Sequence, residues 1–91
     1  MKRSTATERR HLAAVADLGC IVCGGPAQVH HRIEGRYSQS RASHYETMPL
    51  CDLHHREAHA KPHEFRAEHG SEWALIGKTY ARLMAEKERT I

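Results

Sequence analysis

Two short half-sites of metal-ligand residues constrain this chain more than any other feature. Cys20 and Cys23 form a Cys-x-x-Cys pair, and Cys51 and His54 form a Cys-x-x-His pair. Two such turns can each present two ligands to one tetrahedral zinc ion. Because a site with four protein ligands is closed, we expect it to stabilise the fold and to perform no catalysis itself.

The size of the chain makes such a metal useful. A domain of 91 residues buries little apolar surface. A structural zinc site can contribute about 10–16 kcal/mol of apparent binding free energy to folding.

The cysteines also indicate the cellular compartment. Three cysteines cannot all pair, and no apolar signal segment precedes them, so we expect an intracellular, cytoplasmic protein. A redox Cys-x-x-Cys motif is the alternative, but the Gly-Gly-Pro that follows Cys23 fits it poorly. No apolar stretch approaches the roughly 20 residues of a membrane span.

Caps and apolar spacing predict a small α+β domain over residues 1–91. The expected elements are a helix over 5–18, a zinc knuckle and hairpin over 20–50 with strands at 28–33 and 46–50, a helix over 52–60, and C-terminal helices over 63–88. Thr5 and Glu8 fit a capping box, and Asp52 is the expected N-cap of its helix. Helical spacing predicts a buried stripe on the last helix: Trp73, Ile76, Tyr80, Leu83 and Met84.

Histidines are the second notable feature, with nine in the chain. His55 and His59 are four residues apart, so they project from one face of a helix and can bind the same ion. His30 or His31 on the preceding strand is the natural third ligand, and strand neighbours point to opposite faces. The other member of that pair could then act as a general base, because a pKa of about 6.5 suits proton transfer near neutral pH. The alternative is a set of surface or capping histidines.

The order of these motifs resembles the HNH nucleases, and most closely their phage-type, Ref-like branch of RecA-dependent nucleases. The matching motifs are Leu18-Gly19-Cys20, His30-His31, Pro49-Leu50-Cys51, His54-His55 and the run from Phe65 to Gly70. The likeness covers about residues 13–75. It implies a zinc-stapled ββα-metal core, which is a two-stranded hairpin plus a helix, with flanking N-terminal and C-terminal helices.

The resemblance also implies roles for individual residues. His30, His55 and His59 would bind one catalytic divalent metal, Mg²⁺, Mn²⁺ or Zn²⁺, placed to stabilise the transition state at a scissile phosphate. His31 would be the general base that deprotonates the attacking water. His44 would orient His31 or brace the loop. It occupies the middle position of the motif, where the wider superfamily often has Asn, and Glu46 lies near the same position.

Three arginines that flank the implied site are candidates for DNA phosphate contacts: Arg32, Arg36 and Arg41. The net charge of +3 and a pI near 9.0 agree with a polyanionic partner.

The implied function is a metal-dependent DNA endonuclease, nicking or double-strand cleaving, of phage or prophage origin and with a role in DNA recombination or processing. If it is phage-encoded, it would act in the host cytoplasm. A RecA-type recombinase filament is a further candidate partner; dependence on it stays open, because only a short stub stands where Ref has a long basic extension. The alternative is a non-catalytic zinc-binding module that docks on DNA or on a recombination protein. Such a module would need the cysteine site but no convergent histidines.

Overall fold

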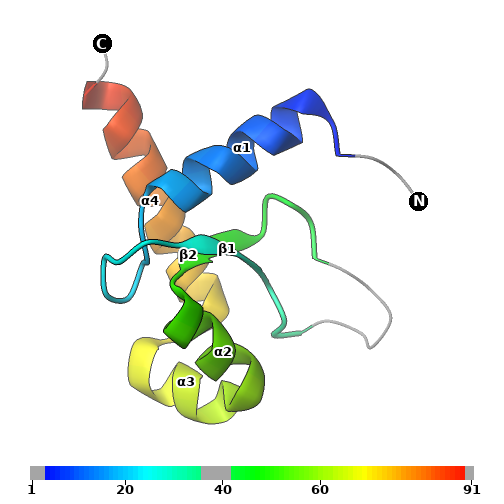
Figure 1. Ribbon diagram of the computed structural model, residues 1–91, viewed down its shortest axis with the longest axis vertical. Coiled ribbons are helices and arrows are strands. Elements are labelled where there is room, and N and C mark those ends of the chain that lie inside the picture. Colours follow the sequence, from blue (N-terminus) through cyan, green and yellow to red (C-terminus); the bar gives the residue numbers. More distant parts are fainter. Residues whose placement is uncertain (1–3, 36–41, 90–91) are drawn as a thin grey trace.

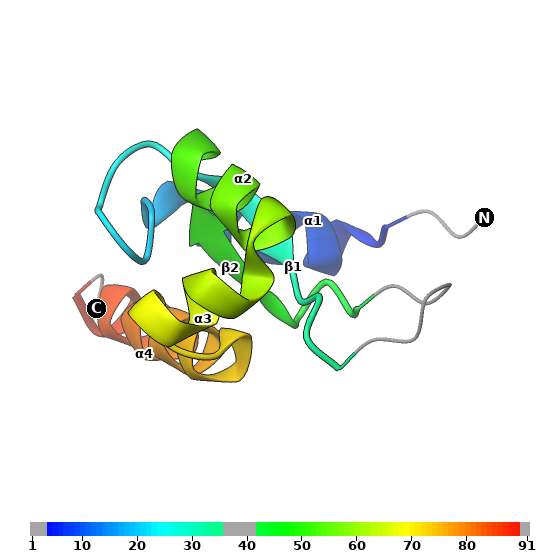
Figure 2. The same ribbon diagram turned by 90° about the horizontal axis from the view of Figure 1, so that it is seen from below.

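The computed structural model describes residues 4–35 and 42–89 of the chain. Its elements follow in the order α1 (Ala6–Asp17), β1 (Gln28–His31), β2 (Thr47–Leu50), α2 (Asp52–Ala60), α3 (Pro62–His69) and α4 (Glu72–Arg89). The two strands form an antiparallel hairpin, with α1 on one side and α2 and α3 on the other (Figures 1 and 2). α4 runs from α3 past the hairpin to the C-terminal end of α1 (Figure 1). The predicted small α+β fold is confirmed.

The adjacent histidines of β1, His30 and His31, point to opposite faces of the hairpin. His30 pairs with Met48 and His31 with Thr47. The strands are shorter than the predicted ranges, although the Arg32 N–H still donates to the Glu46 carbonyl at 3.0 Å. β2 is buried along its whole length because α1, α2 and α4 all contact it.

The helix starts follow the sequence with one exception. Thr5 and Glu8 form the predicted capping box, with hydrogen bonds of 3.0 and 2.8 Å. The prediction that Asp52 caps α2 is wrong, because Cys51 occupies that position and its sulfur accepts the His54 N–H at 3.5 Å. Asp52 is instead the first residue of the helix, where a negative charge faces the positive end of the helix dipole. The start of α2 is therefore fixed by a candidate metal ligand.

The core lies where β2 meets the helices on both sides. It comprises Cys20, Ile21, Met48, Leu50, Ala58, Phe65, Leu75 and Ile76. Since Cys20 belongs to this cluster, the cysteine half-sites and the core form one packed unit.

The buried stripe predicted for α4 is partly wrong. The buried residues are Glu72, Leu75, Ile76 and Thr79, whereas Trp73 is 49 % exposed and Met84 is 65 % exposed. The buried face of α4 is thus rotated around the helix from the expected one, because Glu72 in its first turn points into the protein. None of the helices in the described ranges is both long and apolar enough to cross a membrane.

Candidate metal centres

The first half-site is a tight turn that places two cysteines close together. The Gly24 N–H donates to the Cys20 carbonyl at 2.8 Å, and the Cys20 N–H donates to the Gly25 carbonyl at 2.8 Å. Gly19, just after α1, has a φ of +81°, and a Cβ there would lie 3.1 Å from the Gly24 oxygen. A larger residue at Gly19 would therefore strain the turn.

The four residues of the two half-sites converge. Cys51 Sγ lies 3.2 Å from His54 Nδ1 and 3.8 Å from Cys23 Sγ, and Cys20 Sγ lies 3.6 Å from His54 Nδ1. Zinc bonds of about 2.3 Å to sulfur and 2.0–2.1 Å to nitrogen would give tetrahedral separations of about 3.8 Å for S–S and 3.5 Å for S–N. The observed spacings agree with these values. All three cysteines are outside disulfides, so this cluster could hold a structural metal ion.

The electrostatics of Cys20 also suit a metal ligand. Burial raises the pKa of this thiol, but hydrogen bonds from the backbone N–H groups of Cys51, Cys23 and Val22 and from the His54 side chain lower it, to a net value of about 6. Because metals bind the thiolate form, a low thiol pKa favours binding near neutral pH.

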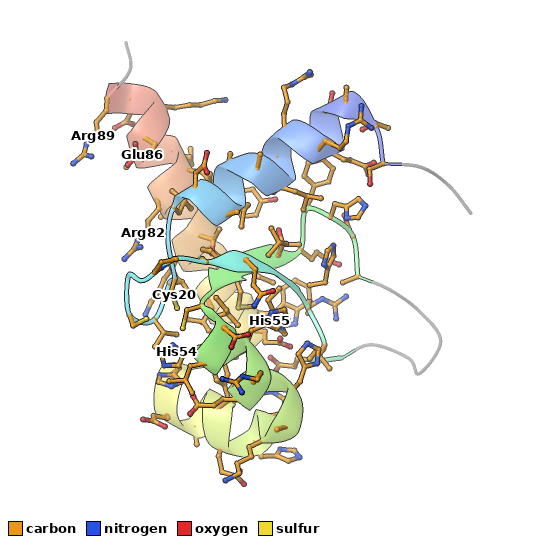
Figure 3. All side chains as sticks on the ribbon, viewed as in Figure 1. Cys20, His54, His55, Arg82, Glu86 and Arg89 are labelled. Carbon is orange, nitrogen blue, oxygen red and sulfur yellow. The ribbon has the colours of Figure 1, made fainter. Side chains whose placement is uncertain are left out.

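A second cluster brings together three of the predicted histidines. Ring centres are 5.0 Å apart for His30 and His55, 5.1 Å for His30 and His59, and 5.0 Å for His55 and His59. Imidazoles bound at 2.0–2.1 Å to one tetrahedral ion would have ring centres about 5 Å apart. One ligand nitrogen from each ring lies within 4.8 Å of the others, so this trio could also hold a metal ion. His55 lies apart from Cys20 and His54, which belong to the first cluster (Figure 3).

Two further observations fit a cation at this trio. His30 is completely buried, and its Nδ1 has no hydrogen-bond partner among the described residues. Burial lowers the pKa of His55, and His30, His59 and His31 lower it further against the opposing charge of Asp52. A neutral imidazole is the form that binds metals.

The buried Glu72 binds His30 from behind, and the sequence analysis missed this residue. Glu72 Oε2 lies 2.5 Å from His30 Nε2, and its other oxygen accepts the backbone N–H groups of Ile33 and Glu34 at 2.9 and 2.5 Å. Burial raises the pKa of Glu72, but the hydrogen bonds from His30, Glu34 and Ile33 outweigh it, so the net pKa lies below its usual value. In the sequence, Glu72 is indistinguishable from an ordinary acidic residue in the first turn of a helix.

His31 lies on the opposite side of β1 and joins the predicted His44. His31 Nε2 is 2.9 Å from His44 Nδ1, and His44 Nε2 is 3.1 Å from Ser4 Oγ. Although His31 is not one of the trio, it is near enough to His55 to contribute to the low pKa of that residue. The structure thus divides the adjacent histidines between two clusters, and it pairs Glu46 with Arg32.

Of the three predicted phosphate contacts, only Arg32 can be placed. Its guanidinium lies 4.5 Å from the centre of the Trp73 ring, 3.2 Å from Glu46 Oε1, and it also donates to the Glu34 carbonyl. Arg32 is thus held by the protein itself. Arg36 and Arg41 lie outside the described residues.

Two members of the trio, His55 and His59, line a surface hollow of about 580 Å³ together with Gln28 and Arg56. Arg56 is 73 % exposed and lies 3.1 Å from Asp52 on the same helix. A small charged group could reach the two histidines from this side.

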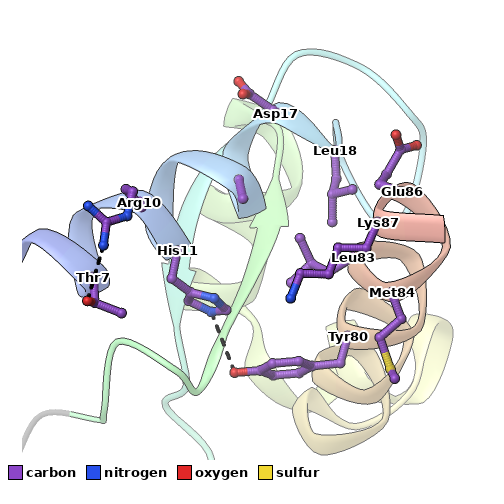
Figure 4. A pocket seen from close by; sticks show the side chains of 11 residues that line it. Thr7, Arg10, His11, Asp17, Leu18, Tyr80, Leu83, Met84, Glu86 and Lys87 are labelled. Carbon is purple, nitrogen blue, oxygen red and sulfur yellow. Dashed lines mark hydrogen bonds between the residues drawn. The ribbon is translucent and has the colours of Figure 1, made fainter. Parts of the chain in front are cut away.

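A larger groove of about 780 Å³ lies between α1 and α4 (Figure 4). Its lining includes Leu18, Leu83 and Met84, and the Tyr80 hydroxyl beside it lies 3.5 Å from His11 Nε2. None of its lining residues belongs to either metal cluster. It is therefore separate from the candidate centres.

Comparison with known proteins places the chain in one family. No curated protein matches the sequence. One family model does match, over residues 1–85, and its description is a protein of unknown function, DUF968. Both candidate metal clusters fall within the matched residues. Since the match covers most of the chain, the protein belongs to the DUF968 family.

Proposed function

We propose that this protein is a metal-dependent DNA endonuclease of the HNH, ββα-metal type. The observation that carries the proposal is the convergence of His30, His55 and His59 from a hairpin and the following helix. Their rings meet beside a hollow, and the buried Nδ1 of His30 lacks a partner within the described structure. Three protein ligands with an open side are typical of a catalytic metal site, whereas four ligands are typical of a structural one.

The two clusters would hold different ions. Cys20, Cys23, Cys51 and His54 would bind structural zinc, and the histidine trio would bind the catalytic divalent metal. When bound, that metal supplies Lewis-acid stabilisation of negative charge on a phosphodiester. Imidazole donors suit Zn²⁺ and other transition ions better than Mg²⁺, which prefers oxygen ligands.

His31 would accept the proton of the attacking water. If His44 Nε2–H donates to Ser4, then His44 Nδ1 accepts the proton of His31 Nε2–H. In this tautomer the basic lone pair of His31 is on Nδ1. His44 would thus orient the base through a hydrogen bond, as the resemblance to HNH nucleases implies.

DNA phosphates would enter through the hollow beside His55 and His59. Arg56 lines it, and its exposed pairing with Asp52 is worth less than about 1 kcal/mol. A phosphate could therefore replace that carboxylate at little cost. Arg32 is held between Glu46 and Trp73 and would brace the loop after β1. Backbone contacts of this kind favour binding without strong sequence preference.

The direct test is incubation of supercoiled plasmid with the protein and Mn²⁺, Zn²⁺ or Mg²⁺. We expect nicked or linear products, and we expect His31→Ala to abolish cleavage while folding and metal content stay unchanged. His63→Ala is the matched control, because His63 is exposed on α3. Equal loss of metal or of folding in His31→Ala would count against its role as the base.

The same preparation tests the alternative. Two metal ions per chain together with plasmid cleavage support the nuclease. One ion and no cleavage favour a non-catalytic zinc-binding module that docks on DNA or on a recombination protein. A parallel reaction with a RecA-type recombinase filament tests whether cleavage needs that partner. The resemblance to the RecA-dependent nucleases implies that it does.

A further inference from the structure

Glu72 occupies an unusual position for a carboxylate. It is the first residue of α4 and only 3 % exposed, beneath the hairpin and next to the completely buried His30. A buried charge is costly unless hydrogen bonds or an opposite charge compensate it. Glu72 must therefore have specific partners.

Those partners fix the carboxylate at both oxygens. Oε1 accepts the backbone N–H groups of Ile33 and Glu34, and Oε2 lies 2.5 Å from His30 Nε2. The backbone N–H of Glu72 in turn donates to the Glu34 side chain at 3.0 Å. These reciprocal contacts attach the start of α4 to the residues that follow β1, so the carboxylate has little freedom to turn away from His30.

The contact with His30 also decides which of its nitrogens carries the proton. An ionised carboxylate only accepts hydrogen bonds, so His30 must donate from Nε2. A neutral His30 then has its lone pair on Nδ1, the buried atom without a partner among the described residues. The ring is therefore directed as a metal ligand through Nδ1.

We propose that Glu72 is the positioning residue of the histidine trio, fixing the ring and tautomer of His30 and thereby setting the affinity of the trio for a divalent metal. The inference rests on the proposed function, because the trio is the catalytic centre in that proposal. Outer partners of this kind hold the imidazole in place and increase its basicity, and their removal typically weakens metal binding by about 10–100-fold. A carboxylate beside His30 also offsets part of the charge of the ion.

A purely structural role is the competing explanation. In that case Glu72 would only join α4 to the backbone after β1, and its proximity to His30 would be incidental. The two roles differ in one measurable property. Removing a structural interaction lowers stability with or without metal, whereas removing a positioning interaction weakens metal binding specifically.

The test uses the full chain with zinc in its cysteine site, titrated with Co²⁺. Cobalt bound by histidines lacks the thiolate absorption that it shows at a cysteine site, so the two sites can be distinguished. Glu72→Gln keeps the shape of the side chain and its acceptor oxygen but removes the charge. We expect Co²⁺ to bind the trio of this variant about 10–100-fold more weakly, with unchanged zinc content. Glu64→Gln, an exposed change of equal charge on α3, should bind like the wild type.

Co²⁺ affinity within twofold of the wild type in Glu72→Gln would overturn the proposal, as would an equal loss in Glu64→Gln. A second measurement does not depend on any variant. Nitrogen chemical shifts of the wild-type imidazoles should show His30 protonated at Nε2, and the opposite tautomer would overturn the proposal.

Neither measurement requires DNA or cleavage. Weakened cobalt binding in Glu72→Gln with an inactive wild type would support the positioning role and refute the nuclease. An active wild type with unchanged cobalt binding in Glu72→Gln would refute the positioning role alone.

Discussion

His31 Nε2 lies 2.9 Å from His44 Nδ1, although His31 ends β1 and His44 lies 13 residues later, in the loop that leads to β2. His44 is in turn anchored by Ser4 just before α1. The N-terminal segment and the hairpin therefore meet at the proposed base, and the orientation of His31 depends on contacts that are distant in sequence.

Replacing His44 should slow cleavage without changing metal content. His44→Ala removes the acceptor for His31 Nε2–H, so the base is poorly oriented. We expect a decrease in kcat smaller than the roughly 10²–10⁴-fold loss expected when a general base is removed. His44→Asn restores a hydrogen-bonding group and should recover part of the rate. Single-turnover cleavage with saturating metal measures both effects, and a full rate in His44→Ala would refute the orienting role.

Loss of Cys20 should unfold the domain. This cysteine is completely buried in the core and belongs to the first candidate metal cluster. Cys20→Ser removes a ligand whose ion is expected to contribute several kcal/mol to folding. Circular dichroism should show loss of helix and of a cooperative thermal transition. Ala67→Ser, at an exposed position of α3, is the control. A folded, zinc-free Cys20→Ser protein would contradict the structural role of the cysteine site.

His59→Ala should reduce the metal content from two ions per chain to one. The cysteine cluster is intact in this variant, so we expect the fold to persist while cleavage is abolished. Elemental analysis after dialysis measures the stoichiometry, with His63→Ala as the control. Two ions retained in His59→Ala would show that the trio is not the second metal site.

Arg32→Ala should destabilise the protein. The change removes the stacking on Trp73 and the pairing with Glu46, and we expect a loss of about 1–2 kcal/mol. Trp73 is the only tryptophan, so its fluorescence should change as well. Arg82→Ala, exposed on α4, should leave both properties unchanged. Unaltered stability in Arg32→Ala would indicate that its interactions contribute little.

Arg56→Gln should weaken DNA binding and leave stability almost unchanged. Arg56 is mostly exposed beside the histidine hollow. Each duplex phosphate that a protein no longer neutralises changes the slope of log affinity against log salt by about 0.9. Fluorescence anisotropy at several salt concentrations, without added divalent metal, measures this slope. Arg82→Gln controls for the removal of one positive charge. The same slope in both variants would place the phosphate elsewhere.

The pairs that build the two candidate metal clusters were predictable because the spacing within each pair is local. Cys20 with Cys23, and His55 with His59, are brought together by a single turn or by one helical repeat. The sequence also identified both His30 and His31 as candidates. Their opposite orientations follow from the alternation of a strand.

Other features depend on packing between distant segments and could not be predicted. Glu72 acquires its role only when α4 folds back against His30, 42 residues earlier in the chain. Trp73 follows the apolar spacing of α4, but it lies beside Arg32 at the surface. Cys51 caps α2 with a sulfur that also belongs to the cysteine cluster, whereas cap preferences pointed to Asp52.

The Cys51 sulfur that caps α2 links the two candidate metal clusters. Cys51 belongs to the cysteine cluster and caps the helix that carries His55 and His59. If both clusters bind ions as proposed, oxidants or chelators that remove the ion of the cysteine cluster would disorganise the histidine trio, whereas emptying the trio would leave the cysteine cluster intact. In the proposed nuclease, oxidation of these thiols would therefore be expected to stop cleavage.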